Sequence, residues 1–181
     1  MKDSEILKQG KVLIYPTDTI WGIGCDAQNV NAVERIKQIK GRDNTKSFIL
    51  LVKDVQMLSR YVERIPEGAM QIILQASSPV TIIYPQSRNL PIEHLSFNGS
   101  IGIRIAQNSY LQQLFNEFDR PIVSTSANFS GQPSPQCFDD IDKELLKQAD
   151  YVSQYMRKEK SSGKSSDIYL IKDENELIKL R

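Results

Sequence analysis

Residues 12–46 read VLIYPTDTIWGIGCDAQNVNAVERIKQIKGRDNTK, and this stretch decides the fold class. The apolar run 12–15 predicts a short buried strand, which Pro16 ends because proline has no N–H to donate to a sheet. Residues 17–19 then follow the carboxyl end of a strand, where open α/β sheets bind ligands. From Asn29, a predicted N-cap, apolar residues recur at helical spacing. A strand, a polar loop and a helix in this order indicate an α/β protein.

The middle of this stretch carries glycines and its end carries cations. Gly22 and Gly24 are predicted to let the backbone turn closely after the polar loop. Between residues 35 and 46, cationic side chains outnumber the one acid, Asp43. Such a run is often a solvated surface, but here it separates two core elements. A guanidinium fork and a nearby ammonium suit an oligophosphate. We therefore interpret this basic segment as part of a site for an anionic ligand.

Length and composition limit the class of protein. With 181 residues, 40% of them apolar, we expect one domain covering residues 1–181. The net charge of +1 argues against a surface that binds nucleic acid as a whole. Cys25 and Cys137 are too few for a disulfide framework, which is typical of a reducing compartment. No signal peptide or membrane-spanning run is predicted, so we expect a cytoplasmic protein.

A single histidine, His94, restricts the chemistry. A Ser-His-Asp or Cys-His catalytic device would have to use this residue, which lies in a polar stretch over 85–99 that we predict to be an exposed loop. No CxxC or HExxH spacing indicates a zinc site. Hydrolysis by covalent catalysis is therefore not favoured, and no protein-held metal is predicted.

The other predicted elements indicate a mixed sheet, because the strands do not alternate strictly with helices. We expect further helices over 3–9, 54–61, 67–75, 108–118 and 139–148, and further strands over 48–52, 80–84, 101–105, 121–123, 151–152, 168–171 and 177–180. By composition, residues 161–166 are expected to be a flexible linker. They are not a phosphate-binding P-loop, since Lys158 stands where that motif needs glycine.

Two of the predicted strands carry polar groups of interest. Arg104 falls inside the apolar strand 101–105, where an unpaired charge would be costly. Its partner is either a core carboxylate, for which Asp18 is the candidate, or the carboxylate of a substrate. Ser124 to Asn128 follow the strand 121–123, and these hydroxyl and amide groups either form a turn or line a ligand site.

These motifs together resemble the YrdC-like family of threonylcarbamoyl-adenylate synthases over nearly the whole chain. The resemblance rests on four motifs in order: 16–19 with 21–27, 40–42 with Lys46, 100–104, and 124–128 with 130–135. It implies a single-domain α/β fold, in which a mixed twisted sheet with flanking helices surrounds a positively charged cleft. The implied reaction joins L-threonine, bicarbonate and ATP, with Mg²⁺, into threonylcarbamoyl-AMP and pyrophosphate. A downstream transferase complex would then use this product to modify tRNA.

The resemblance also implies roles for individual residues. The implied catalytic set is Lys40, Arg42, Ser126 and Asn128. The implied ATP contacts are Arg42, Lys46, Ser100, Ser126, Ser134 and Arg181. The implied threonine contacts are Thr19, Arg104, Ser124 and Ser166. The chain departs from the family pattern at Trp21, where tyrosine is usual, at Leu51, where some members have histidine, and at 165–167, where the Ser-Thr pattern is weaker.

Two alternatives remain beside the synthase. A non-catalytic member could use the same cleft to bind double-stranded RNA, tRNA or ribosomes, and such binding would weaken steeply with salt. A relative could instead form a carbamoyl-adenylate for another acceptor, without depending on threonine. Threonine-dependent release of pyrophosphate discriminates among the three.

Overall fold

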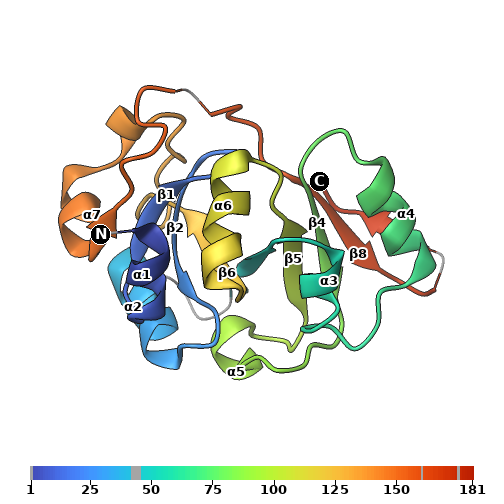
Figure 1. The fold of residues 1–181 in the computed structure, drawn as a ribbon. Coiled ribbons are helices and arrows are strands. Elements are labelled where there is room, and N and C mark those ends of the chain that lie inside the picture. Colours follow the sequence, from blue (N-terminus) through green and yellow to red (C-terminus); the bar gives the residue numbers. More distant parts are fainter. Residues whose placement is uncertain (1, 42–45, 160, 175) are drawn as a thin grey trace.

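The computed structural model describes residues 2–41, 46–159, 161–174 and 176–181, and their strands form one sheet (Figure 1). The nine strands of this described part lie in the order β7-β1-β2-β6-β3-β5-β4-β8-β9. Their bounds are β1 Leu13–Pro16, β2 Trp21–Asp26, β3 Ile49–Val52, β4 Val80–Tyr84, β5 Ile101–Ile105, β6 Ile122–Ser126, β7 Tyr151–Val152, β8 Asp167–Ile171 and β9 Leu177–Lys179. The pairs β1/β7, β3/β5 and β4/β8 are parallel and the others antiparallel, so the prediction of a mixed sheet is confirmed.

Helices flank this sheet. They are α1 Asp3–Lys8, α2 Val30–Lys40, α3 Val55–Leu58, α4 Glu67–Gln75, α5 Ile92–Leu95, α6 Ser109–Phe118 and α7 Lys143–Gln148, with a 3₁₀ turn at Phe138–Asp140. Figure 1 shows α1 and α6 side by side in front of the sheet, with the two chain ends on opposite sides of the molecule. No helix in the described part of the chain is long and apolar enough to cross a membrane.

Several predicted elements and caps are confirmed. β4 and β5 have the predicted bounds, and α1, α2, α4 and α6 lie where apolar spacing placed them. Asn29 caps α2 by accepting the Ala32 N–H at 3.1 Å, and Asn108 caps α6 by accepting the Leu111 N–H at 2.7 Å. Gly41 ends α2 in the left-handed region, at φ +54°.

Other predictions were wrong. Gly22 and Gly24 lie inside β2 and not in a turn, and residues 124–126 belong to β6 and do not follow it. The helix predicted for 54–61 is only the short α3, and α7 begins at Lys143, after the 3₁₀ turn. The stretch 85–99 contains α5 and a buried residue, Leu95, so it is not simply an exposed loop. In each case tertiary packing, which local composition does not report, decides the structure.

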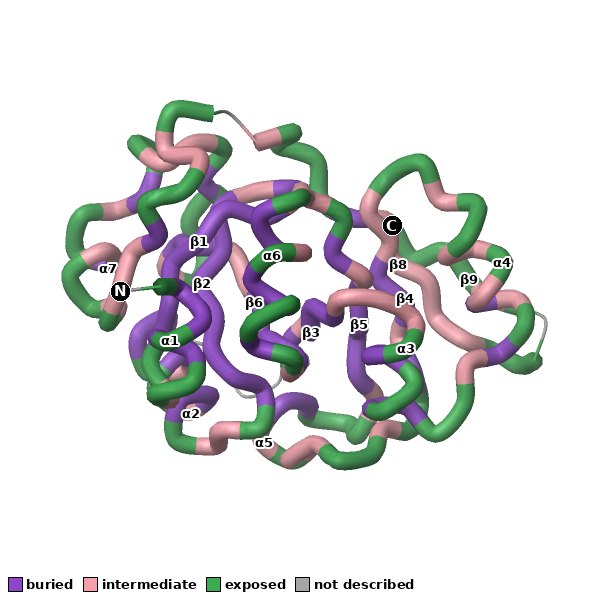
Figure 2. Tube along the Cα trace, viewed as in Figure 1, coloured by how far each residue is buried: buried purple, intermediate pink, exposed green. Residues whose placement is uncertain are grey.

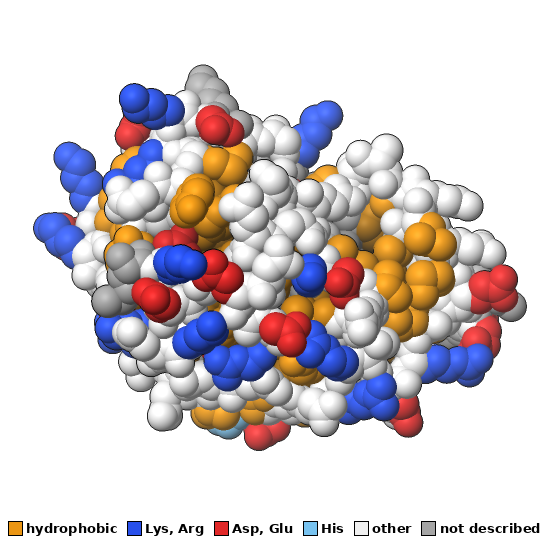
Figure 3. Space-filling model, viewed as in Figure 1, with side chains coloured by type: hydrophobic (Ala, Val, Ile, Leu, Met, Phe, Trp, Pro, Cys, Tyr) orange, Lys and Arg blue, Asp and Glu red, His pale blue; other side chains and the backbone are white. Residues whose placement is uncertain are grey.

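The hydrophobic core surrounds the central strands. Figure 2 shows β1, β2, β3 and β5 largely buried, while the β8–β9 hairpin is partly or fully exposed. Figure 3 shows hydrophobic side chains gathered in a hollow near α3 and α4, which is lined by residues that include Tyr84 and Ile103. The strand residues that line this hollow belong to one face of β4 and β5.

The opposite face of the sheet carries a polar strip. Residues paired across neighbouring strands present side chains on the same face. The observed registers therefore place these residues on one face: Tyr15, Gly22, Gly24, Ser124, Ser126, Ile49, Gly102, Arg104 and Thr81. The three strand glycines on this face have no side chain to fill it, and the hydroxyl groups and the arginine stand beside them.

Candidate functional site

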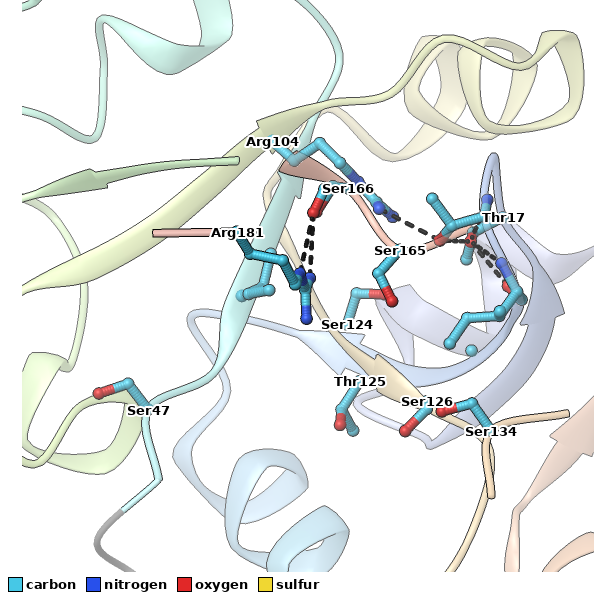
Figure 4. A pocket seen from close by; sticks show the side chains of 14 residues that line it. Thr17, Ser47, Arg104, Ser124, Thr125, Ser126, Ser134, Ser165, Ser166 and Arg181 are labelled. Atoms are coloured by element: carbon cyan, nitrogen blue, oxygen red, sulfur yellow. Dashed lines mark hydrogen bonds between the residues drawn. The ribbon is translucent and has the colours of Figure 1, made fainter. Parts of the chain in front are cut away.

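A cleft of about 220 Å³ opens on this polar face of the sheet (Figure 4). Hydroxyl side chains dominate its lining: Thr17, Thr19, Ser47, Ser124, Thr125, Ser126, Ser134, Ser165 and Ser166. Ile20, Gly22 and Ile49 contribute apolar surface, and the charged lining residues are Arg104 and Arg181. Among the described residues two cations and no acid line the cleft, a lining with the charge and donors suited to an anion.

Arg104 is the central charged group of the cleft. Only 6% of it is exposed, and its Nη1 donates to the Thr19 hydroxyl at 3.2 Å. Its Nε has no hydrogen-bond partner among the described residues, and no described carboxylate forms an ion pair with it. Burial lowers the pKa of the Arg104 guanidinium. A buried guanidinium with an unused donor is the arrangement expected for a site that receives an anion.

The alternative partner for Arg104, Asp18, has a different role. Its carboxylate accepts the N–H groups of Gln107 at 3.2 Å and Asn108 at 2.5 Å, at the start of α6. A carboxylate is favourable there because the free N–H groups of a helix end carry partial positive charge. Asp18 therefore fastens the loop after β1 to α6, and the fixed ion pair that the sequence left open does not form.

The loop after β1 orients the Thr19 hydroxyl. Thr17 Oγ1 donates to the Ile20 carbonyl at 2.7 Å and lies 3.1 Å from Thr19 Oγ1. Such hydroxyl-to-backbone bonds hold tight turns. The turn brings Thr19 beside Arg104, so two of the predicted threonine contacts are adjacent.

Lys40 and Asn128 support the cleft from behind its lining. Lys40 is buried and its Nζ donates to the carbonyl oxygens of Ser126 and Asn128, each at 2.5 Å. The Asn128 amide donates to the carbonyls of Phe129 and Gln132, at 3.0 and 2.6 Å. These bonds fix the end of β6, and with it the Ser126 side chain.

The segment 161–166 has no regular secondary structure, as expected of a linker, and its Ser165 and Ser166 line the cleft; its flexibility stays a prediction. Gly163 N donates to the Thr19 carbonyl at 3.0 Å, and Ser161 N donates to the Gln136 carbonyl, also at 3.0 Å. Ser166 is buried, with its hydroxyl 2.8 Å from that of Thr81. Backbone hydrogen bonds to the Gln136 and Thr19 carbonyls thus anchor this serine-rich segment.

Arg181 also lines the cleft, where it contacts the segment 161–166. Its Nε and Nη2 donate to the Ser166 carbonyl at 3.2 and 3.1 Å. Figure 4 shows Arg104 and Thr17 on one side of the cleft, Ser126 and Ser134 on another, and Ser165, Ser166 and Arg181 between them. Residues from widely separated parts of the chain thus meet in one cleft.

The predicted site residues therefore fall into three groups. Those that line the cleft are Thr19, Arg104, Ser124, Ser126, Ser134, Ser166 and Arg181. Lys40 and Asn128 lie behind the lining, whereas Lys46 is exposed and Ser100 donates its hydroxyl to Asn98 at 2.8 Å, outside the lining. Arg42 lies outside the described residues. Ser47, Thr125 and Ser165 also line the cleft and were missed, although each adjoins a predicted residue in the sequence.

The single histidine lies outside the cleft. His94 lies on α5, where its Nδ1 is 2.9 Å from a Glu34 carboxylate oxygen, and it does not line the cleft. Among the described residues no group of three or more His, Cys, Asp or Glu side chains is placed to hold a metal ion.

Fold and site together define an α/β protein with a cleft lined by hydroxyl groups and arginine. The sequence model of one family, Sua5_yciO_yrdC, described as "Telomere recombination", matches residues 5–181. The chain belongs to this Sua5/YciO/YrdC family.

Individual relatives agree with this membership. The threonylcarbamoyl-AMP synthase of Vibrio vulnificus strain YJ016 is 32% identical over 149 residues, which cover 81% of this chain and 80% of the relative. The crystal structure of E. coli YciO matches with a TM-score of 0.82 at 26% identity, over 98% of this chain and 85% of the other. P. abyssi Sua5, solved with L-threonine, matches the fold with a TM-score of 0.82 at 24% identity; this chain spans 52% of its length.

Proposed function

We propose that this protein is an L-threonylcarbamoyl-AMP synthase, a nucleotidyltransferase that joins L-threonine, bicarbonate and ATP and releases pyrophosphate. The observation that carries the proposal is Arg104, a buried guanidinium without a carboxylate partner among the described residues, in a cleft lined by hydroxyl groups. Curated relatives at 30–33% identity bear this name. In addition, P. abyssi Sua5 was solved with L-threonine.

Arg104 and Thr19 form the proposed amino-acid subsite. The Arg104 guanidinium would receive the α-carboxylate of threonine, using the unpartnered Nε. Charge-assisted hydrogen bonds of this kind are short and strong, and Arg–carboxylate pairs are often bidentate. Ser124 and Ser166 line the cleft close to this end and supply further hydroxyl donors.

Ser126, Ser134 and Arg181 form the proposed nucleotide subsite. Their hydroxyl and guanidinium groups would bind phosphate oxygens, and Lys40 fixes Ser126 through its carbonyl. Arg42, Lys46 and Ser100 are further proposed ATP contacts from the family resemblance. Magnesium fits this lining as an ion carried by the nucleotide, since Mg²⁺ is commonly held through substrate phosphates and few protein ligands. It would neutralise phosphate charge there, beside hydroxyl groups such as that of Ser126.

The reaction needs positioning more than a side-chain base. The threonine amine attacks the carbon of bicarbonate, and loss of water leaves a carbamate. A carbamate oxygen then attacks the α-phosphorus of ATP, and the bond to the β-phosphate breaks to release pyrophosphate. Holding the carboxylate and phosphates in fixed places makes both steps intramolecular in effect, and arginines offset the negative charge that accumulates.

The product is a reactive mixed anhydride, so a second protein must use it promptly. We propose that a tRNA threonylcarbamoyl transferase complex receives it, which would place the reaction in the cytoplasm with ATP and tRNA. Purified transferase should therefore increase product consumption without changing the dependence on threonine.

Pyrophosphate release tests the function directly. Wild-type protein with ATP, Mg²⁺ and bicarbonate should release pyrophosphate only when L-threonine is added, and Arg104→Met should lose this release. Release without threonine would instead indicate a carbamoyl-adenylate-forming relative. No release, together with salt-sensitive binding of double-stranded RNA or tRNA, would indicate a non-catalytic RNA-binding protein.

A further inference from the structure

Tyr15 is a buried tyrosine on the same face of the sheet as the cleft, and the proposed reaction has given it no role. It is 0% exposed, and its hydroxyl has no hydrogen-bond partner among the described residues. A buried hydroxyl without a partner costs stability, whereas phenylalanine would fill the same space without that cost. The retained hydroxyl therefore calls for a physical explanation.

The strand register directs this hydroxyl toward the cleft. Tyr15 is paired with Gly22, and Gly22 and Gly24 are paired with Ser126 and Ser124 on the next strand. A Cβ built on Gly24 would lie 2.9 Å from both Cε1 and Oη of Tyr15 and would collide with the Val123 carbonyl. The ring of Tyr15 thus extends across β2 over a position that only glycine leaves open.

Ser124 lies next along this direction. A Cβ on Gly22 would lie 3.4 Å from Ser124 Oγ, whereas a Cβ on Gly24 would lie 2.9 Å from Tyr15 Oη. Gly22 and Gly24 are neighbouring positions on one face of β2, so the two hydroxyl groups lie over adjacent positions of that strand. Ser124 lines the cleft, as Figure 4 shows. Tyr15 is therefore separated from the cleft by the side chain of Ser124.

The electrostatics agree with this placement. Burial raises the pKa of the Tyr15 hydroxyl, while the Ser124 hydroxyl and the Arg104 guanidinium act to lower it. The net effect keeps the phenol protonated, so that it is a hydrogen-bond donor. A serine hydroxyl that accepts one hydrogen bond remains able to donate another.

We propose that Tyr15 is a positioning residue for the amino-acid subsite. Its hydroxyl donates to Ser124 Oγ when the amino acid is bound, which turns the Ser124 proton toward the carboxylate held on Arg104. This inference rests on the proposed function, because it assigns the carboxylate of L-threonine to Arg104. Tyr15 itself does not touch the substrate.

Tyr15→Phe tests this role, with Tyr84→Phe as a matched control. Tyr84 is also buried, and its hydroxyl also lacks a partner among the described residues, but it lies on the opposite face of the sheet. Tyr15→Phe should raise KM for L-threonine about tenfold, the change expected for one hydrogen bond. KM for ATP and the unfolding temperature should match those of Tyr84→Phe, since both variants remove only an unpartnered hydroxyl.

A double-mutant cycle isolates the coupling to Ser124. In the Ser124→Ala background, Tyr15→Phe should cause no further rise in KM for L-threonine, because the hydrogen bond to be removed is already absent. Fully additive effects, an equal rise in Tyr84→Phe, or equal rises in KM for ATP and threonine would each overturn the inference. Direct calorimetric titration with L-threonine separates the two claims: wild-type protein that neither binds nor uses threonine would overturn the proposed function and the inference with it. Wild-type binding with unchanged affinity in Tyr15→Phe would overturn the inference alone.

Discussion

Arg104 and Asp26 are both buried charged residues on strands, and their surroundings differ. Asp26 is 3% exposed and has partners: the Arg120 Nη1 at 2.8 Å and the Gln28 N–H at 3.0 Å. Arg104 has one hydroxyl partner, an unpartnered Nε and no ion pair with a described carboxylate, although the nearby Asp18 charge opposes the lowering of its pKa by burial. A charge that serves the fold is paired within the chain, because an unpaired one is costly. The difference supports the proposal that Arg104 receives its anion from a ligand.

The largest expected effect is on catalysis by Arg104→Met. Removing one partner of a buried, hydrogen-bonded charge pair costs about 2–5 kcal/mol, so kcat/KM for L-threonine should fall at least about thirtyfold. Arg120→Met is the control, since it removes an arginine from the other buried pair and should leave kcat/KM near the wild-type value. Equal losses in both variants would break the comparison. Steady-state pyrophosphate assays measure both.

The same two variants should change stability in opposite directions: Arg104→Met should stabilise the protein and Arg120→Met should destabilise it. Arg104→Met replaces an unpaired buried charge by an apolar side chain of similar length, and should raise the free energy of unfolding by about 1–3 kcal/mol. Arg120→Met leaves the Asp26 carboxylate without its cation. Since Arg120 is 38% exposed, we expect a loss of only about 1–2 kcal/mol. Urea unfolding measures both, and a destabilised Arg104→Met protein would argue that Arg104 serves the fold.

Thr19→Val sharpens the description of the Arg104 site. Valine keeps the shape of threonine but removes the hydroxyl that Arg104 Nη1 contacts. KM for L-threonine should rise about fivefold to tenfold, as for one lost hydrogen bond, with KM for ATP unchanged. The backbone of residue 19 still accepts from Gly163 N, so the wall of the cleft should remain. A larger change in KM for ATP than for threonine would place the amino acid elsewhere.

The smallest effect concerns Asp26 and pH. Burial raises the pKa of Asp26 above its ordinary value of 3.8, although the Gln28 N–H and Arg120 oppose this. A raised pKa in the folded state means that stability falls as the pH rises through that pKa. Asp26→Asn removes this fall, and its free energy of unfolding should stay within about 1 kcal/mol of the wild-type value at neutral pH. The free energy of unfolding of Asp26→Asn, relative to that of wild type, should therefore increase when the pH is raised from below 3.8 to neutral. Urea unfolding at both pH values checks the sign, and a relative loss would show that the ion pair dominates.

Sequence reasoning found the elements that depend on local patterns. Helix caps at Asn29 and Asn108, and strands rich in β-branched residues such as β4, follow from short-range rules and are confirmed. β2 was missed because Gly22 and Gly24 have low intrinsic preference for strands. Tyr15 and the Val123 carbonyl lie against Gly24, and Thr17 and Ser124 lie close to Gly22, contacts that only the three-dimensional structure reveals.

The candidate site was predicted in part for the same reason. The family resemblance named Thr19, Arg104 and Ser126, which line the cleft. It did not reveal that Lys40 lies behind the lining, because the carbonyls that Lys40 binds belong to a strand distant in sequence. Nor did it resolve the partner of Arg104, since the hydrogen bonds that Asp18 accepts from Gln107 and Asn108 depend on how α6 docks.

Calorimetric titration with L-threonine and with L-threoninamide, which lacks the carboxylate, tests the central claim that Arg104 holds the carboxylate of the substrate. Wild-type protein should bind L-threonine and bind the amide far more weakly, because the charge-assisted hydrogen bonds are lost. Arg104→Met should bind both weakly and no longer distinguish them. Equal binding of the two compounds by wild-type protein, or discrimination that survives in Arg104→Met, would contradict the account.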